Sequence, residues 1–239
     1  KTGRPLAAWR ADSLLMPASN RKLLSTALAL RTLGPEFTFE TRFWARGEIG
    51  ADGTLRGDLI VEAAGDPTWR PAFLGGRSGV SVLSDFARGA RAAGIQRVTG
   101  RLLIDTSAWL DPAPVPPGWG WDQTTELYGS LPSALAANEN RVVLTISPGE
   151  REGEPCRVES LPALETSLSI VNYSRAAAPS RRQTIRLTRS AGPAALILLG
   201  EFPRGLQPLS LTVPLPDPTS AWAEVLLGRL RAEGVNVEG

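Results

Sequence analysis

The sequence predicts an α+β protein built from several domains. Two helical patterns lie near its ends, at residues 19–33 and 217–234, and short apolar runs fill most of residues 141–211. Pro and Gly residues separate many of these runs, which is typical of β-strands joined by turns. A chain of 239 residues is long enough to bury a full core or to form more than one compact unit.

The first helix is predicted from the spacing of its apolar residues. Four of them follow one another at steps of four, three and three, namely Leu23, Ala27, Leu30 and Leu33. This spacing predicts one buried helix face. Gly34-Pro35 ends the helix, and Pro17 lies just ahead of its start, so Ser19 falls in or near the first turn.

Ser19 and Lys22 are three residues apart, so on a helix their side chains project from the same face. Ser is common at N-caps, which gives a purely structural interpretation. A capping box, however, has Glu or Gln three residues after the cap, and cations in the first turn oppose the helix dipole. Because Arg21 and Lys22 occupy this turn, we favour a catalytic interpretation, in which Ser19 is a nucleophile and the Lys22 amine is its base.

The composition supports this pairing. Of the 26 basic residues only Lys1 and Lys22 are lysines, and the chain has no histidine. Arginine keeps its proton, so it cannot serve as the base, and without histidine a Ser-His-Asp triad is excluded. Lysine is the base that remains for a nucleophilic serine.

The first half of the chain mixes strands and helices. Residues 1–16 suggest a short strand pair, and alternation from Phe37 to Phe43 predicts a half-buried strand. Asp52-Gly53 predicts a hairpin turn. Further expected elements are a strand at residues 59–61, a helix at 81–93, a strand at 101–105 and a proline-rich loop at 109–121.

The second half is predicted to be an antiparallel β domain that ends in a helix. Apolar runs recur around residues 142–144, 168–170, 184–187, 196–199 and 209–211. Asp217 followed by Pro218 is typical of a helix start, and an apolar pattern with Trp222 continues to Gly234.

Charge and cysteine content exclude several classes of protein. The formal net charge is +2 with interspersed signs, whereas a nucleic-acid-binding protein has a basic stripe or face. Cys156 is the one cysteine, so no internal disulfide forms, and without histidine we expect no zinc site. No run of about 18 apolar residues occurs, so no transmembrane segment is expected, and the chain opens without an apolar signal region.

Several motifs together resemble one enzyme family. They are Pro17-Ala18-Ser19-x-x-Lys22, Gly57-Asp58-Leu59-Ile60-Val61, Gly65-Asp66-Pro67, Gly118-Trp119-Gly120-Trp121-Asp122, Tyr128, Ser133-Ala134-Leu135 and Asn138-x-Asn140. This combination resembles the low-molecular-mass, class C penicillin-binding proteins of the D-alanyl-D-alanine carboxypeptidase/endopeptidase type. The resemblance spans most of the chain.

The resemblance implies a catalytic domain of the penicillin-binding, serine β-lactamase-like type that is split by inserted accessory domains. The implied division is residues 1–45 for the N-terminal part of the catalytic domain, 46–66 and 131–215 for a β-rich accessory domain, 67–130 for a nested accessory domain, and 216–239 for a return to the catalytic domain.

The resemblance also implies the chemistry. Ser19 would form an acyl-enzyme with peptidoglycan stem peptides ending in D-Ala-D-Ala, with Lys22 as base, and β-lactam antibiotics would acylate the same serine. Asp122 and Tyr128 would help to bind the substrate, although a solvated loop acid beside a packed tyrosine explains them equally well. No metal or other cofactor is implied, and the location is periplasmic or extracytoplasmic.

Two further motifs of such enzymes are not where the family has them. The sequence contains no Ser-x-Asn, and Lys1-Thr2-Gly3, which matches a Lys-Thr-Gly motif, precedes the nucleophile. An opening turn is the simpler interpretation of these three residues, and a permuted active site is the alternative. We therefore expect the chain to be part of a longer protein that holds the rest of the catalytic domain. Two alternatives remain, a serine β-lactamase-like or esterase hydrolase and a non-catalytic cell-wall-binding module.

Overall fold

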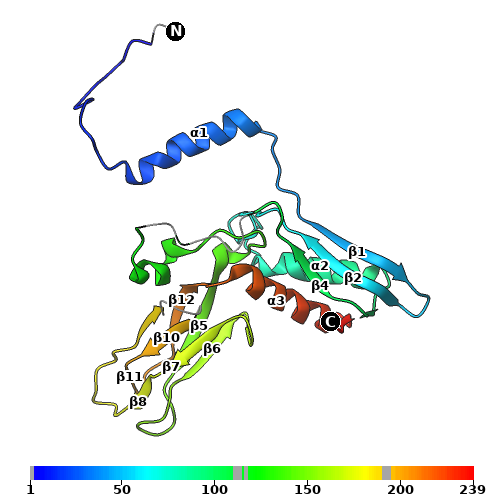
Figure 1. The fold of residues 1–239 in the computed structure, drawn as a ribbon. Coiled ribbons are helices and arrows are strands. Elements are labelled where there is room, and N and C mark those ends of the chain that lie inside the picture. The colour runs from blue at the N-terminus through cyan, green and yellow to red at the C-terminus, as the bar shows by residue number, and fades with distance from the viewer. Residues whose placement is uncertain (1–2, 110–114, 116–117, 190–194) are drawn as a thin grey trace. The chain divides into compact units, whose positions relative to one another are not determined.

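A computed structural model describes residues 3–109, 115, 118–189 and 195–239 (Figure 1). The chain divides into two units, residues 1–38 and residues 39–239. We describe each unit by itself. The α+β class is confirmed, since helices and several sheets are both present.

The unit of residues 1–38 contains η1 (Ala18–Asn20) and α1 (Arg21–Leu33), as predicted for the first helix. The strand pair predicted within residues 1–16 is wrong for the described residues 3–16, which contain no strand. All of these residues are exposed, and a strand pair needs a hydrophobic face or a neighbouring element to be stable. Lys1 and Thr2 of the Lys-Thr-Gly match lie outside the described residues.

The unit of residues 39–239 contains a mixed sheet with the path β1-β2-β3-β13, and β4 also pairs with β2. Its strands are β1 (Arg42–Ile49), β2 (Thr54–Glu62), β3 (Arg97–Val98), β4 (Leu102–Asp105) and β13 (Asn236–Val237). The predicted hairpin turn is confirmed, because β1 and β2 are antiparallel and Asp52 accepts the Thr54 backbone N–H at 3.1 Å. The strand predicted from Phe37 begins only at Arg42.

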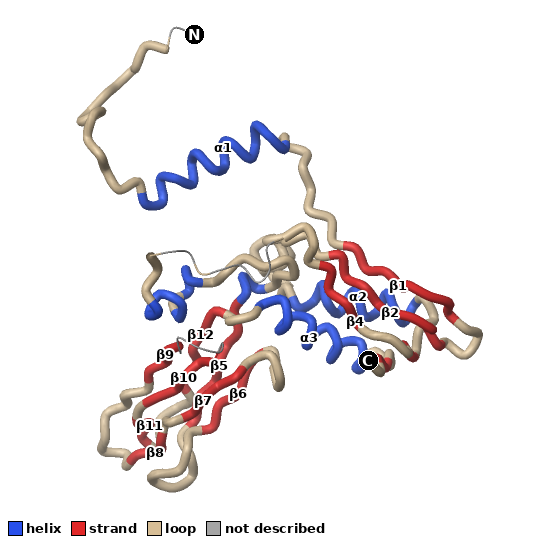
Figure 2. The backbone as a smooth tube through the Cα atoms, viewed as in Figure 1, coloured by secondary structure: helices blue, strands red, loops and turns tan. Residues whose placement is uncertain are grey.

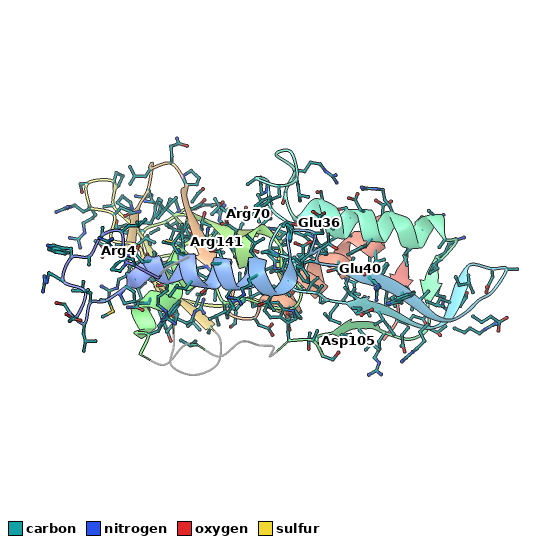
Figure 3. The ribbon with its side chains drawn as sticks, turned by 90° about the horizontal axis from the view of Figure 1, so that it is seen from above. Arg4, Glu36, Glu40, Arg70, Asp105 and Arg141 are labelled. Carbon is teal, nitrogen blue, oxygen red and sulfur yellow. The ribbon has the colours of Figure 1, made fainter. Side chains whose placement is uncertain are left out.

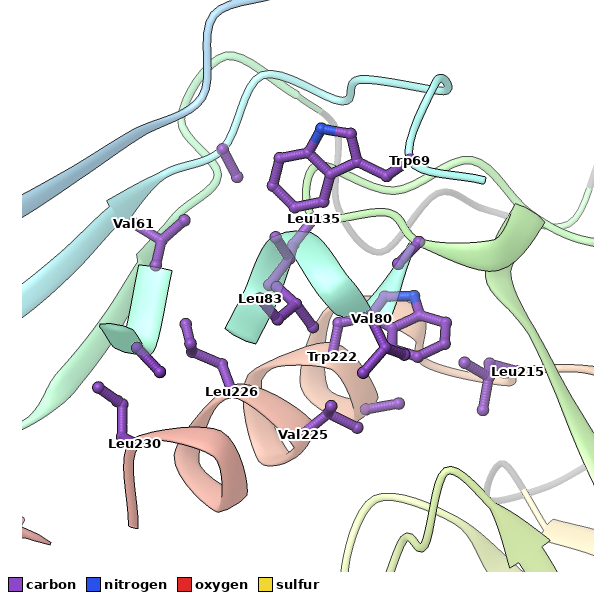
Figure 4. Close-up of a cluster of buried hydrophobic side chains, with 14 of the residues drawn as sticks. Val61, Trp69, Val80, Leu83, Leu135, Leu215, Trp222, Val225, Leu226 and Leu230 are labelled. Carbon is purple, nitrogen blue, oxygen red and sulfur yellow. The ribbon is translucent and has the colours of Figure 1, made fainter. Parts of the chain in front are cut away.

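Two helices share the main core with this sheet. They are α2 (Val80–Ala92) and α3 (Pro218–Ala232), both close to their predicted positions. Figure 4 shows Trp222, Val225, Leu226 and Leu230 of α3 beside Val80 and Leu83 of α2. Asp217 caps α3 by accepting the Ser220 backbone N–H at 3.1 Å, as its sequence predicts.

Glu224 joins α3 to the loop at residues 165–167. Its carboxylate accepts the backbone N–H of Ser167 at 2.8 Å and the hydroxyls of Thr166 and Ser167 at 3.0 and 2.6 Å, and it also accepts the backbone N–H groups of Glu165 and Thr166. Burial raises the pKa of Glu224, but these hydrogen bonds outweigh burial and lower the pKa to about 2.

Residues 141–214 form smaller sheets, seen as the red strands at the lower left of Figure 2. An antiparallel sheet contains β5 (Arg141–Ser147), β6 (Arg157–Leu161) and β12 (Leu209–Pro214), and a second sheet contains β7 (Ser169–Asn172), β9 (Arg186–Arg189) and β10 (Ala195–Leu199). β8 (Arg175–Ala177) pairs with β11 (Glu201–Pro203).

The prediction of a purely antiparallel domain is wrong for two of these pairings. β10 pairs with β7 in parallel, and β11 pairs with β8 in parallel. An apolar run indicates a strand but not the direction of its neighbour: β10, which buries Leu196 and Leu198, runs parallel to β7 and antiparallel to β9. Cys156 is buried and lies in a small second core with Phe202.

The division into domains at residues 45, 66, 130 and 215 stays a prediction. Strands from residues 42–105 and 236–237 belong to one sheet, and α3 shares its core with α2. Among the described residues, no helix is both long and apolar enough to span a membrane.

Candidate active site

Ser19 and Lys22 lie on one continuous helical segment. Ser19 is in η1, and Lys22 follows in the first turn of α1. The backbone stays in the right-handed helical region at Asn20 and Arg21, so the two side chains keep an i, i+3 relation on one face. Both residues are exposed. This segment therefore presents a hydroxyl and an amine on the same exposed face.

The backbone turns sharply just before Ser19. Ala18 has a φ of 42°, whereas Pro17 before it has a φ of −73°. A non-glycine residue in the left-handed region costs about 1–3 kcal/mol, and such residues cluster at functional sites. The N-cap residues are Pro17 for η1 and Asn20 for α1, and neither side chain makes a capping hydrogen bond within the described residues. The N-cap interpretation of Ser19 thus has no hydrogen bond to support it.

The leucine face of α1, which the spacing of its apolar residues predicts to be buried, is exposed in this unit. Leu23 is 71% exposed, Leu30 is 59% exposed and Leu33 is 52% exposed. Residues 1–38 form a unit of their own, and its described residues 3–38 contain no α-helix besides α1 and no sheet against which this face could pack. The pattern fixes which face is apolar but cannot supply the layer that covers it.

Asp122 and Tyr128 belong to the other unit, so the structure describes them separately from Ser19. Asp122 lies in η2 (Trp121–Thr125), and its side chain lies outside the described part of the structure. Tyr128 lies in η3 (Leu127–Gly129), is 65% exposed, and packs edge-to-face on Trp119 with ring centroids 6.3 Å apart. An exposed phenol on an aromatic support suits substrate contact.

Arg141, which the sequence analysis did not single out, holds the helix that carries Tyr128. Its guanidinium donates to the Leu127 carbonyl oxygen at 2.6 Å and to Ser130 Oγ at 3.1 Å, on either side of Tyr128. It also pairs with Glu139, which in turn pairs with Arg70. Figure 3 labels Arg70 and Arg141. This network fixes the position of η3 relative to β5.

A left-handed turn at η4 (Asn138–Asn140) organises the same region. All three of its residues have positive φ, from 45° to 59°. Asn138 Oδ1 accepts the Gly79 backbone N–H at 2.7 Å at the start of α2. Asn140 Nδ2 donates to the Leu131 carbonyl oxygen at 2.8 Å. Asparagine tolerates this conformation better than most residues, so the Asn-x-Asn motif could have predicted the turn.

A cavity of about 570 Å³ opens beside this turn. Its wall includes Gly65-Asp66-Pro67, Trp109, Ser133 and Asn140, which belong to or adjoin the motifs of the sequence analysis, and also Arg70 and Glu139. Trp109 lies so close to Gly65 that a Cβ there would be 2.1 Å from the indole Cζ2. Glycine is therefore required at position 65, and the Gly-Asp-Pro motif has a local packing reason.

Comparisons with known proteins give a consistent result. The sequence profile of the D-Ala-D-Ala carboxypeptidase 3 (S13) family matches residues 1–239. The chain is 26% identical over 244 residues to the D-alanyl-D-alanine carboxypeptidase of Actinomadura sp., which covers 100% of this chain and 43% of that protein. It is 27% identical over 153 residues to the D-alanyl-D-alanine carboxypeptidase DacB of Haemophilus influenzae, covering 64% of this chain and 30% of that protein.

A solved structure shares the fold. Penicillin binding protein 4 (dacB) from Haemophilus influenzae superposes with a TM-score of 0.70 at 23% identity, covering 98% of this chain and 49% of that protein. The same protein in complex with a novel β-lactam gives a TM-score of 0.64 at 19% identity. The chain thus spans less than half the length of these relatives.

Proposed function

Because the chain belongs to the D-Ala-D-Ala carboxypeptidase 3 (S13) family, we propose that it carries the nucleophile of a serine-type D-Ala-D-Ala carboxypeptidase/endopeptidase. The observation that supports this proposal is the spacing of Ser19 and Lys22 on one exposed helical segment. The substrates would be peptidoglycan stem peptides, and the enzyme would work outside the cytoplasm, at the cell wall.

In the proposed reaction, Ser19 Oγ attacks the carbonyl carbon of the terminal D-Ala-D-Ala peptide bond while Lys22 Nζ accepts the hydroxyl proton. An ester forms between Ser19 and the remaining peptide, the peptide bond breaks, and the proton passes to the amine of the leaving D-alanine. Water then hydrolyses the ester and restores the serine. The Ser19 backbone N–H, at the start of a helical segment, would help to stabilise the oxyanion.

Asp122 and Tyr128 are proposed to contact the substrate. Asp122 would bind a cationic end of the stem peptide, and Tyr128 would offer its exposed ring and hydroxyl. Arg141 would be a positioning residue, since it holds the backbone on both sides of Tyr128. A β-lactam would acylate Ser19 in the same way as the peptide.

The test is to incubate the protein, expressed from its complete gene, with labelled penicillin and to map the adduct by peptide mass. We expect the label on Ser19 and its loss in Ser19→Ala. Ser25→Ala is a matched control on the same helix, because in the described part of the chain the Ser25 hydroxyl bonds back to the Arg21 carbonyl oxygen at 3.2 Å. An adduct on another serine would contradict the assignment.

The rate at which the penicillin label is released, together with the cleavage of D-Ala-D-Ala peptides, separates the proposed function from the two alternatives. A β-lactamase-like enzyme or esterase would release the penicillin label quickly and leave D-Ala-D-Ala peptides intact. A non-catalytic binding module would take up no label. We expect slow release of the label and cleavage of D-Ala-D-Ala peptides.

A further inference from the structure

β1 is an edge strand of the mixed sheet. It pairs with β2 on one side, and within the described residues no strand pairs with its other side (Figure 1). Seven of its eight residues are exposed, and Phe43 is half-buried. An edge strand of this length presents a row of backbone N–H and C=O groups that another strand can pair with.

The sequence of β1 is complementary to itself when read in the opposite direction. If a second copy lies antiparallel with Ala45 opposite Ala45, the residues at positions 42–48 of the strand face suitable partners of the other copy. The facing pairs are Arg42 with Glu48, Phe43 with Gly47, and Trp44 with Arg46, each occurring twice. These pairs give two ion pairs, two aromatic contacts over glycine and two cation–π contacts.

The positions of the side chains agree with this pairing. Arg42, Trp44, Arg46 and Glu48 alternate along β1 and therefore point to one face of the sheet. Trp44 is 51% exposed, and its indole donates to Glu62 Oε2 at 3.2 Å, which holds the ring in place. Each copy therefore offers a fixed indole to the Arg46 guanidinium of the other. Within its own chain Arg46 pairs with Asp58, and Arg42 pairs with Glu40 and Glu62. Both arginine side chains stay exposed in these ion pairs, so in the dimer Trp44 and Glu48 of the second copy would add to them.

Other registers are less favourable. In a joined sheet that keeps the helices of both copies on one side, side chains that point to one face in the first copy must lie opposite side chains that point to the same face in the second. Only some shifts of the two strands meet this condition. A shift that centres the pairing on Trp44 places Arg42 opposite Arg46, and one that centres it on Arg46 places two copies of Arg46 opposite each other. Like charges directly opposite each other destabilise a strand pair.

We propose that β1 pairs with β1 of a second copy, so that two sheets become one continuous sheet across a two-fold axis at Ala45. This is an isologous contact, in which the same patch serves on both molecules. Charged residues on an edge strand normally prevent pairing. Here they favour one partner, this same strand, in one register.

The first test is disulfide trapping in Ala45→Cys. Directly opposite residues have Cβ atoms about 4.5–5.5 Å apart, within reach of a disulfide after a small adjustment. The natural Cys156 is buried, so the unsubstituted chain is a clean background. Ser210→Cys is the matched control, because Ser210 is an exposed residue of another strand, β12. We expect oxidation to give a crosslinked dimer of Ala45→Cys at least ten times faster than of Ser210→Cys, and equal rates would overturn the proposal.

The second test uses charge reversal and carries its own control for misfolding. Arg42→Glu places its new carboxylate opposite Glu48 of the second copy, and Glu48→Arg places its new guanidinium group opposite Arg42. Each variant alone should therefore sediment as a monomer. In a mixture, the glutamate introduced at position 42 of one variant would face the arginine introduced at position 48 of the other. The native Glu48 of the first variant would then face the native Arg42 of the second.

We expect dimers to return only in the mixture, which misfolded variants could not form. A mixture that stays monomeric while the unsubstituted chain dimerises would overturn the proposal. An unsubstituted chain that stays monomeric up to millimolar concentration would overturn it as well.

Discussion

Trp222 on α3 donates its indole N–H to the side-chain oxygen of Asn140 at 3.0 Å, and both side chains are buried. The same asparagine donates to the Leu131 carbonyl oxygen at 2.8 Å and to Ser133 Oγ at 3.0 Å. One side chain thereby joins the last long helix, the turn before β5 and the segment after η3.

Replacing Asn140 should therefore destabilise the unit of residues 39–239. Asn140→Gly keeps the left-handed backbone available but removes all three hydrogen bonds and leaves buried polar groups unpaired. We expect the free energy of unfolding to fall by about 2–4 kcal/mol, measured by urea denaturation. Asn236→Ala, an exposed control, should change it by less than about 0.5 kcal/mol. A loss for Asn140→Gly as small as that of the control would show that the bridge does not stabilise the unit.

Arg141 should control the order of η3 more than overall stability. Arg141→Lys keeps the charge, but one ammonium cannot reach Glu139, Ser130 and the Leu127 carbonyl oxygen together. Hydrogen exchange at residues 123–130 should become about ten times faster, while exchange in α2 stays unchanged. Arg157→Lys is a suitable control, since Arg157 pairs only with the exposed Glu150 among the contacts of the described residues. Unchanged exchange at residues 123–130 would contradict this role.

The hydrogen bonds that Glu224 accepts from residues 165–167 predict that the free energy of unfolding depends on pH. Its pKa is lowered to about 2 in the folded chain, from an ordinary value of 4.5, so the folded state favours the ionised form. The resulting stabilisation is full above about pH 5 and is lost as the pH falls towards 2. Glu224→Gln should cost about 1–3 kcal/mol at pH 7 and almost nothing at pH 2. Glu165→Gln, which changes an exposed side chain of the same loop, should show no such difference. An equal cost of Glu224→Gln at both pH values would rule out ionisation as the cause.

Lys22 should be needed for its ability to release a proton. Lys22→Arg keeps the charge and the helix propensity, but arginine stays protonated near neutral pH. In the complete protein, acylation by penicillin should slow by a factor of about 10²–10⁴, while the melting temperature changes by less than about 2 °C. Arg21→Lys, the neighbouring control, should acylate at the normal rate. Near-normal acylation by Lys22→Arg would contradict the assignment of Lys22 as the base.

Much of the local structure was predictable. The helix of residues 81–93, the capped helix after Asp217 and the hairpin around Asp52-Gly53 agree with the structure, because caps, turns and periodicity act over a few residues. The strand pair predicted in residues 1–16 was wrong for the described residues 3–16, because short alternation without a neighbouring layer does not hold a strand. The roles of Ser19, Lys22, Asp122 and Tyr128 stay predictions.

The sequence by itself determined which residues are chemically suited to each other, namely Ser19 with Lys22, and which face of each helix is apolar. Only the tertiary structure decided that β10 runs parallel to β7, that Arg141 supports the helix of Tyr128, and that Asn140 meets Trp222. The reason is the range of the forces. Periodicity, capping and turn chemistry depend on neighbours within a few residues, whereas strand direction and buried polar contacts join residues as far apart as 140 and 222 and are selected by the packing of the whole core.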